Sequence, residues 1–435
     1  MARVRPFEVN MVRFLTLLAV AGALLATSSA AGAAAPAGFS APRTVGANLE
    51  VTGAVAASAA AGQGAAVAFA DDSGGVWAAR VRADGSTGSP LPAASGQVVA
   101  RDVQVAVTDR GEIVVVWAAL LDHRGRSAVR YAVAAPGRSF SGTRTLAAVG
   151  SYAAATPRVA ALRGGTVAVI FRDTSRAGST GVLRYARRAP HGAFGPARSL
   201  GHDGVGPAIA ASPGGGALLA WGRGPLTRRA LEVGSAARGA TLPGAARSVA
   251  GRIRRFTLSA APDGTAWVAW TRGVAGGATG FARRTRAGNT AAVGPVRSLG
   301  TVAYGVPHVA LDASGRVLVA WSARGPGAQP NVGLATAQGT GAALGAPAVF
   351  DAGGFSQTSP IPALVRGTPL VLFTRQIPTT TGAPAEAAAA NPATGEATVL
   401  GPAGGIGAPA LAQPGAGIVV AWAALGGGAA ASTLP

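Results

Sequence analysis

The stretch DASGRVLVAW, from Asp312 to Trp321, decides the fold because close variants of it recur along the chain. An aspartate and a glycine suggest a turn, and the apolar run VLVAW follows and ends on tryptophan. Its apolar residues do not alternate with polar ones, which is typical of a strand buried on both faces. The run EIVVVW, Glu112 to Trp117, has the same character. Each such strand therefore needs neighbours on both sides.

The aromatic residue that ends the apolar run recurs at intervals of 48 to 54 residues, at Phe69, Trp117, Phe171, Trp221, Trp270, Trp321, Phe373 and Trp422. A period near 50 indicates a repeat architecture. Each unit contains four short segments, and the turns between them carry Gly, Asp-Gly or Pro-His-Gly, which are hairpin signals. No segment has a helical period. The units therefore read as antiparallel four-stranded sheets.

These observations predict an all-β fold, an eight-bladed β-propeller of four-stranded antiparallel blades. In a propeller, neighbouring blades cover both faces of each sheet. A β-sandwich would need alternation on its outer faces, and a parallel β-helix would have shorter coils. The propeller is the architecture that the pattern favours.

The two ends of the chain complement each other. The last unit lacks a fourth segment, while GFSAPRTV, Gly38 to Val45, matches the fourth segments SFSGTRTL at 139–146 and AFGPARSL at 193–200. We therefore expect the N-terminal strand to complete the C-terminal blade and close the ring. Closure would remove two exposed sheet edges.

At fold level the chain resembles the secreted repeat β-propeller superfamily over residues 34–435, without a recurring Trp-Asp dipeptide or a double-glycine kelch pattern. A more distant similarity is to the Asp-box propellers of sialidases, through APDGTAWVAW at 261–270 and, more loosely, TDRGEIVVVW at 108–117. However, Asp109, Asp263 and Asp312 each precede a turn glycine, where a carboxylate caps the backbone locally. The turn also lies between the first and second strands, whereas the sialidase box lies between the third and fourth. The sialidase Arg-Ile-Pro motif is absent, so we assign no catalytic residue.

The N-terminus has the pattern of a Sec-type signal peptide over residues 1–33. Arg3, Arg5 and Arg13 precede an apolar run from Phe14 to Ala26, and small residues follow. That run is too short to span a bilayer. We expect cleavage after Ala30 or Ala33, with Met1 or Met11 as the start, and a single propeller domain at 34–435. The protein is thus expected to be secreted or extracytoplasmic.

The chain of 435 residues has a formal net charge of +21, and all 38 of its basic residues are arginine. This charge favours an anionic partner, and export makes nucleic acid the less favoured one. The absence of cysteine excludes disulfides, thiolate metal sites and a cysteine nucleophile. Four scattered histidines offer no ligand spacing, so we expect neither a metal site nor a cofactor. We expect a monomer.

Arginines form two columns in the repeat. The first lies on the fourth strands, where we expect the stems to pack and the guanidinium groups to protect the outer edges: Arg43, Arg144, Arg198, Arg247 and Arg297. The second follows the aromatic residue by one to three positions: Arg172, Arg223, Arg272, Arg324 and Arg375. Loops after the second and fourth strands emerge on one face of antiparallel blades, so the second column is predicted to make that face cationic.

Ligands of propellers bind at such loop faces. We predict ligand binding by the second column together with Tyr304 and Asp203. The expected function is non-catalytic binding or scaffolding of an anionic polysaccharide or cell-envelope polymer. The alternative is an enzyme, a sialidase-like glycosidase or lyase acting on an acidic saccharide. Side chains placed in the right loops for that chemistry are Tyr152, Tyr304, Asp122, Asp173 and Asp203.

Overall fold

The computed structural model divides the chain into residues 1–35 and residues 36–435, and only the second part contains described residues. The described range is 39–434, without 48, 52–54, 83, 175–180, 213, 262–264, 274–277, 287–293, 313, 325–329, 339–341, 351–355, 377–384, 405–408, 414–416 and 426. The predicted signal peptide, residues 1–33, lies outside the described residues.

The described chain is almost entirely β-strand, in several antiparallel sheets. Three of them follow the chain order: β2 (Ala56–Ala60), β3 (Gly64–Ala70), β4 (Val76–Val81) and β5 (Leu91–Ala94); β6 (Val99–Val107), β7 (Ile113–Leu120), β8 (Ser127–Ala134) and β9 (Arg144–Val149); and β24 (Ser356–Val365), β25 (Thr368–Gln376), β26 (Ala385–Asn391) and β27 (Glu396–Ala403). A fourth sheet joins the chain ends in the order β1 (Arg43–Val45), β30 (Ala429–Leu434), β29 (Ile418–Ala423) and β28 (Ala410–Ala412).

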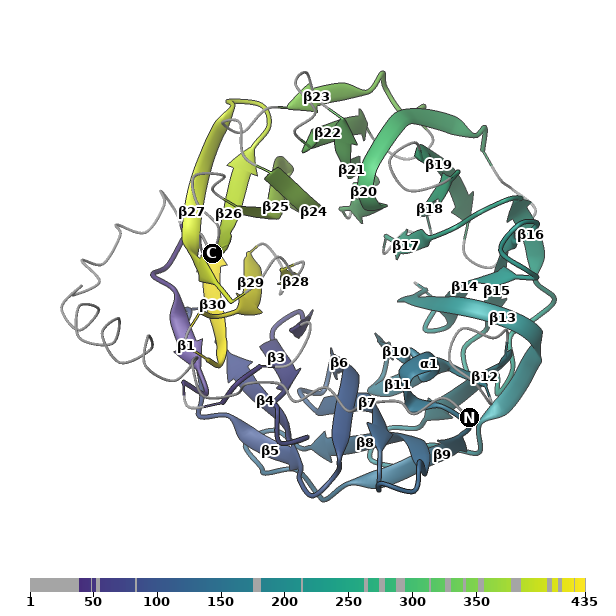
Figure 1. The fold of residues 1–435 in the computed structure, drawn as a ribbon, viewed down its shortest axis with the longest axis vertical. Coiled ribbons are helices and arrows are strands. Elements are labelled where there is room, and N and C mark those ends of the chain that lie inside the picture. The colour runs from purple at the N-terminus through teal and green to yellow at the C-terminus, as the bar shows by residue number, and fades with distance from the viewer. Residues whose placement is uncertain are drawn as a thin grey trace, which may run out of the picture. The chain divides into compact units, whose positions relative to one another are not determined.

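Two further sheets have seven strands each. One contains β10 (Arg158–Leu162), β11 (Thr166–Asp173), β12 (Gly181–Arg188), β13 (Arg198–Ala211), β14 (Ala217–Arg223), β15 (Ala230–Ala236) and β16 (Arg247–Ala250). The other contains β17 (Phe256–Ala260), β18 (Thr265–Arg272), β19 (Ala278–Arg286), β20 (Arg297–Leu311), β21 (Val317–Arg324), β22 (Pro330–Ala337) and β23 (Ala348–Phe350). Figure 1 shows the sheets side by side around a common centre, an all-β, propeller-like arrangement.

These seven-stranded sheets differ from the separate four-stranded blades that the sequence predicts. The long strands β13 and β20 each serve as the fourth strand of one unit and the first strand of the next. Gly204 shows why, because it pairs with Gly181 on one side and with Arg223 on the other. The ladder therefore passes from one unit to the next without a break.

The second strand of each unit is buried on both faces, as its non-alternating sequence predicts. In β7, Val115 and Trp117 pack in a cluster with β3, whereas Val114 and Val116 pack in a cluster with β11. Successive side chains of a strand point to opposite faces, so each sheet packs against the sheets before and after it. The repeated aromatic residues form the centres of these layers, and none is more than 7% exposed.

The first strands lie innermost. Contacts between them link consecutive units from β2 through β6, β10, β13, β17 and β20 to β24, and β2 also contacts β28. Their side chains are mostly small and half-exposed, as in β2, whose sequence is AASAA. β2 therefore leaves small, mostly apolar side chains half-exposed, whereas β6 exposes Arg101 and Asp102.

The N-terminal strand pairs with the last strand of the chain, as the matching segments predict. Arg43, Thr44 and Val45 of β1 lie opposite Ala431, Ala430 and Ala429. The Ser40 amide donates to the Thr433 carbonyl at 2.8 Å, and Phe39 packs in the cluster that contains Trp422. The two ends of the described chain thus share one sheet.

One short helix was not expected from the sequence. α1 (Tyr152–Ala155) lies between β9 and β10, and its Ala154 and Ala155 are buried. The segment is too short to show a helical period, so its sequence gives no signal for a helix. It ends at Thr156, which adopts a left-handed conformation with φ of 38°.

Of the aspartates expected to cap their own turns, Asp312 does so. Asp312 Oδ1 accepts hydrogen bonds from the Ser314 and Arg316 amides, at 2.9 and 3.0 Å. Asp109 behaves differently, because its Oδ2 accepts from the Gly164 amide of the next unit at 2.6 Å. Asp263 lies outside the described residues.

We predict that deleting residues 34–46 lowers the melting temperature by several degrees or causes aggregation. The deletion would expose the edge of β30 and remove Phe39 from the core. Thermal unfolding of the deletion variant beside the chain from residue 34 measures the effect. An unchanged melting curve would show that β1 does not support the C-terminal sheet.

Candidate functional site

A cavity of about 860 Å³ lies beside the beginning of the innermost strands β10 and β17. Its wall includes Arg158 at the start of β10, Arg172 at the end of β11, and Arg255, which directly precedes β17. Neighbouring strands run antiparallel, so β11 ends where β10 begins. The cavity therefore opens on the face that carries the loops after the second strands.

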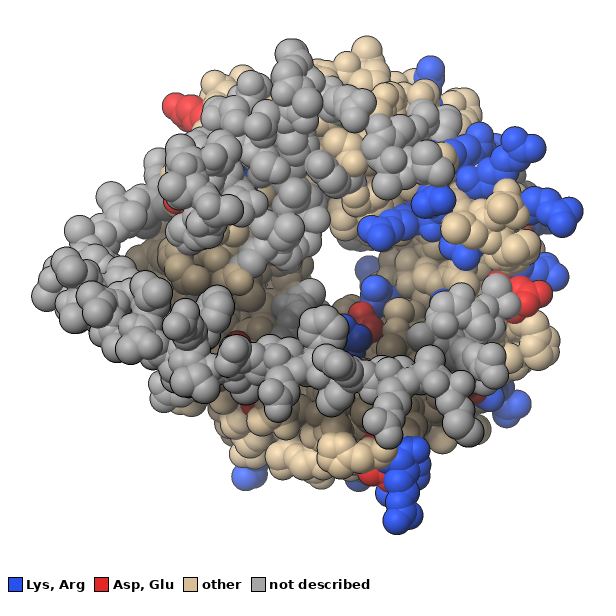
Figure 2. Space-filling view, in the orientation of Figure 1, with Lys and Arg blue, Asp and Glu red and all other residues tan. Residues whose placement is uncertain are grey.

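Five arginines line this cavity: Arg158, Arg172, Arg229, Arg254 and Arg255. Among its described lining residues there is no Asp, Glu, Asn or Gln. Arginine keeps its charge in proteins and offers a rigid fork of donors that matches carboxylate and phosphate. Figure 2 shows Arg side chains gathered beside the central opening. The cavity wall is thus built to attract anions.

Arg172 is the most enclosed of these cations. Its residue is 9% exposed, and its Nε is buried with no hydrogen-bond partner. Burial lowers the pKa of Arg172, and the nearby charge of Arg229 lowers it further. A buried donor without a partner costs free energy on the order of 1–3 kcal/mol, and more for a charged group. An anion in the cavity would relieve both the missing bond and the repulsion.

Arg229 extends the same repulsive group. Burial lowers its pKa, followed by the charge of Arg254. Its Nη1 donates to the Arg254 carbonyl and its Nε to the Gly224 carbonyl, each at a long 3.5 Å. At Arg158, burial lowers the pKa and outweighs the opposing charge of Asp102. Arg229 thus repels Arg172, and Arg254 repels Arg229.

Strained backbone accompanies the cavity. Thr156 lines it in a left-handed conformation, φ 38°, and its buried Oγ1 has no hydrogen-bond partner. Equivalent entry positions of the neighbouring units, Asp102 and Gly206, also have positive φ, at 50° and 56°. The kink is therefore part of the repeat, and glycine adopts it without strain. A β-branched threonine adopts it only at a cost of order 1–3 kcal/mol.

The rest of the wall is largely apolar. Val205, Ile209, Phe256, Leu258 and Val309 contribute to it. His308 also lines the cavity, and burial lowers its pKa to about 4. The imidazole is therefore neutral at neutral pH and adds no charge. The cavity combines a cationic mouth with an apolar surface.

The predicted second column does not gather at this cavity. Of its members only Arg172 lines the cavity; Arg223 is exposed, and Arg272 is half-buried. Arg375 is ion-paired with Glu386, with Nε 2.8 Å from Oε2. The side chains of Arg324 and Tyr304 lie outside the described residues.

Asp203 contacts the second column through its backbone. Its carbonyl oxygen accepts a hydrogen bond at 3.0 Å from the amide of Gly224, the residue after Arg223. Its φ is 61°. Two other carboxylates suggested for an enzymatic role form ion pairs with arginines. Asp122 pairs with Arg126 at 2.5 Å, and Asp173 pairs with Arg184 at 2.8 Å. Neither is among the described cavity residues, so this cavity offers no described acid for proton transfer.

Four of the five cavity arginines were not predicted from the sequence, namely Arg158, Arg229, Arg254 and Arg255. Each lies at or just before the start of a first or third strand, outside both columns. The run GRIRRF at 251–256 was the available signal, because it places three arginines directly before an innermost strand. The fourth-strand column is exposed at every position, as expected of edge strands.

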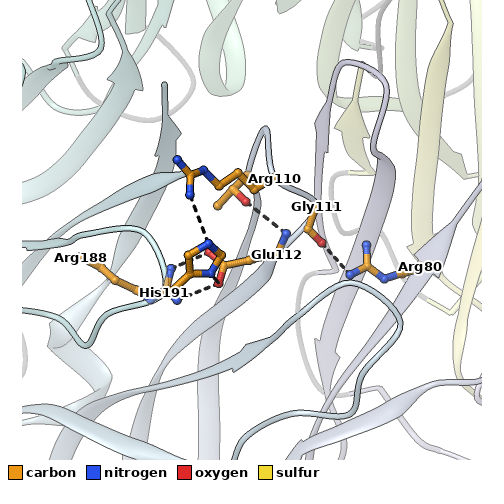
Figure 3. Close-up of polar contacts among 7 residues, drawn as sticks. Arg80, Arg110, Gly111, Glu112, Arg188 and His191 are labelled. Atoms are coloured by element: carbon orange, nitrogen blue, oxygen red, sulfur yellow. Dashed lines mark hydrogen bonds and ion pairs between the residues drawn. The ribbon is translucent and has the colours of Figure 1, made fainter. Parts of the chain in front are cut away.

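A second polar cluster lies on the opposite face, where the tight turns are. Glu112 accepts from both terminal nitrogens of Arg188 at 3.0 and 3.1 Å, and each side chain is 3% exposed (Figure 3). His191 Nδ1 is 3.1 Å from Glu112 Oε1, and its Nε2 is 3.2 Å from Arg110. Arg80 donates to the Gly111 carbonyl at 2.7 Å in the same view. These contacts join neighbouring sheets, so the cluster is structural.

Similar arginine bonds recur between other repeat units. Arg187 donates to the Ala237 carbonyl at 3.1 Å, and Arg316 donates to the Gly367 carbonyl at 3.2 Å. Some of the arginines therefore stabilise the packing of neighbouring units. The cavity arginines are distinct because they line one cavity whose described lining contains no acidic side chain.

The described residues contain no group of three or more His, Asp or Glu side chains that could hold a metal ion. Within the same residues, no helix has the length and apolar character needed to cross a membrane.

Comparison with known proteins gives no family for this chain. No protein family matches it, and no curated protein sequence matches it. Solved structures resemble it at low identity. A protein of unknown function from Dyadobacter fermentans is 14% identical over 64% of this chain and 94% of that one, with a TM-score of 0.40.

An ulvan lyase, described as a new family of polysaccharide lyase, is 13% identical over 77% of this chain and 92% of that one, with a TM-score of 0.47. The Aleuria aurantia lectin is 13% identical over 70% and 97%, with a TM-score of 0.41. At such identities and TM-scores, the likeness supports no inference about ligand or activity.

We predict that Arg188→Met destabilises the fold by about 3–5 kcal/mol, because it leaves the Glu112 carboxylate buried without its partner. The double variant Glu112→Met/Arg188→Met should recover much of that loss. Arg126→Met, which breaks an exposed pair, is the control and should unfold almost like the wild type. Denaturant unfolding measures all of these. Equal stability of Arg188→Met and Arg126→Met would contradict the structural role.

The same pair predicts a loss of stability in acid. Burial alone would raise the pKa of Glu112, but the hydrogen bonds and charge of Arg188, with a contribution from His191, hold it below the usual 4.5. A lowered carboxyl pKa contributes stability that is present above 4.5 and is lost as pH falls through the folded-state value. Below pH 4.5 the wild type should lose more stability per pH step than the double variant. Parallel acid profiles would contradict this.

Proposed function

We propose that the protein is an exported, non-catalytic binding protein that captures an anionic ligand, such as an acidic polysaccharide or cell-envelope polymer, at the arginine cavity. The observation that carries the proposal is Arg172, a cation with a buried, unpartnered Nε in a wall of arginines. An unpaired buried cation is costly unless a counter-charge is present. A bound anion would supply that counter-charge and accept the free donor.

The proposed architecture is an eight-bladed propeller whose ring is closed by β1. Each seven-stranded sheet consists of two units that share β13 or β20, and each four-stranded sheet is one unit. In support of closure, β1 pairs with β30 and β2 contacts β28. Closure would hold the arginines of successive blades at the mouth of one central channel.

The second column of arginines would form the outer part of the binding surface. Arg172 would bind the anion at the cavity, while Arg223, Arg272 and Arg324 would attract more distant charges of a polymer. Tyr304 and Asp203 would contribute from the neighbouring β20 and β13. No catalytic step is part of the proposal.

We predict that Arg172→Gln/Arg229→Gln/Arg254→Gln weakens binding to dextran sulfate and polygalacturonate at least tenfold. Each lost charge-assisted hydrogen bond is worth about 1.5–3 kcal/mol. Binding of the wild type should fall as salt rises, because charges are screened over roughly 10 Å at 0.1 M. Fluorescence anisotropy with labelled polymers measures both effects, and uncharged dextran should not bind.

The matched control is Arg144→Gln/Arg198→Gln/Arg247→Gln, which removes the same charge from exposed edge strands. The control should keep most of the affinity, and both variants should melt as cooperatively as the wild type. If the two triple variants lose affinity equally, then bulk charge alone drives binding and the cavity is not the site.

Export predicts that the mature chain begins between Ala31 and Ala34. The small residues that follow the apolar run provide the cleavage point. N-terminal sequencing of the secreted protein measures this directly. Retention of Met1 or Met11 in the secreted chain would contradict a cleaved signal.

A further inference from the structure

The arginine cavity continues toward a second cavity along the same innermost strands. That second cavity has a volume of about 330 Å³, and Leu162, Ala211 and Ala260 line it from β10, β13 and β17. The arginine cavity uses Arg158, Ile209 and Ser259 of the same three strands. On each strand, no more than two residues lie between the two linings. The strands therefore connect a cationic mouth to a second cavity near the tight turns, whose lining also includes Asp109, Arg163 and Ser212.

The connecting wall is mostly apolar and is accessible. β10 has the sequence RVAAL and β17 the sequence FTLSA, and their residues are half-exposed apart from the buried Leu162. Single exposed apolar residues are ordinary on a protein surface. Contiguous apolar surface next to a charged rim is instead typical of an interaction site.

The same wall has few groups that recognise sugar hydroxyls. Among the described residues of the arginine cavity, neutral polar side chains are Thr156, Thr257, Ser259 and His308. Thr257 is already used, because its Oγ1 donates to the Pro307 carbonyl at 2.5 Å. The part of the ligand that lies beyond its anionic group therefore meets mainly carbon.

We propose that the cavity binds an amphiphilic anion, a phosphate- or carboxylate-type group joined to an aliphatic chain. This inference rests on the proposed anion site and specifies its ligand class. Arg172, Arg229 and Arg254 hold the anionic group at the mouth, and the chain lies along β10, β13 and β17 toward Ala211 and Ala260. Five residues of β10 cover roughly 13 Å at about 3.3 Å per residue, which gives the chain an apolar path of that length.

The test measures affinity against chain length in the mature protein. Isothermal titration calorimetry compares inorganic phosphate, octyl phosphate and dodecyl phosphate, each below its micelle concentration. A buried methylene raises affinity about fourfold. We expect dodecyl phosphate to bind at least tenfold more tightly than octyl phosphate, and inorganic phosphate to be the weakest. Dodecyl maltoside, which carries the chain without the charge, should bind at least tenfold more weakly than dodecyl phosphate.

Variants separate the two halves of the site. Ala161→Gln/Ala260→Gln places polar, larger side chains on the path and should remove the dependence on chain length while inorganic phosphate binds as before. The control Ala189→Gln changes an exposed alanine after β12 and should leave the whole series unchanged. Thermal unfolding checks that all variants fold.

Two results would overturn the inference. If the alkyl phosphates bind no more tightly than inorganic phosphate while acidic polymers still bind, the anion site remains and the apolar path is wrong. If dodecyl maltoside binds as tightly as dodecyl phosphate, the arginines do not select the ligand. Failure of every anion to bind, polymers included, would instead refute the proposed function itself.

Discussion

The burial of both faces of the second strands is the constraint on which this structure depends. Val114 and Val116 of β7 face one neighbouring sheet, and Val115 and Trp117 face the other. A sheet of this kind has no solvent face, so it is stable only between two others. The surfaces left for function are the inner strands and the loop ends. The candidate site uses both surfaces, because it lies where the innermost strands begin.

The distribution of charge follows from the same packing. Arg80 and Arg316 donate to carbonyl groups of adjacent sheets, and Arg188 pairs with a buried carboxylate. These cations satisfy polar groups that burial would otherwise leave unpaired. Arg172 is different, because its enclosed guanidinium lies in a cavity wall with no described carboxylate and is repelled by Arg229. A local violation of this kind is expected at functional sites rather than in the structural framework.

Much of the framework could be predicted from the sequence. The strands β10 and β11, their turn, and the pairing of β1 with β30 all follow from apolar runs and from matching segments. The shared strands β13 and β20 could not be predicted, because no local signal shows that a ladder continues past Gly204. The site was predicted only through Arg172. Glu112 and Arg188 meet from positions 76 residues apart, and the cavity arginines meet across several units, so only the packing of sheets brings them together.

The most direct measurement is a crystal structure of the mature protein soaked in selenate, located by its anomalous scattering. Selenate has the charge and oxygen geometry that a fork of arginine donors accepts. We expect a peak at the mouth of the cavity, with an oxygen within hydrogen-bond distance of Arg172 Nε and near Arg229. Peaks found solely at the exposed edge-strand arginines, with the cavity free of selenate, would contradict it.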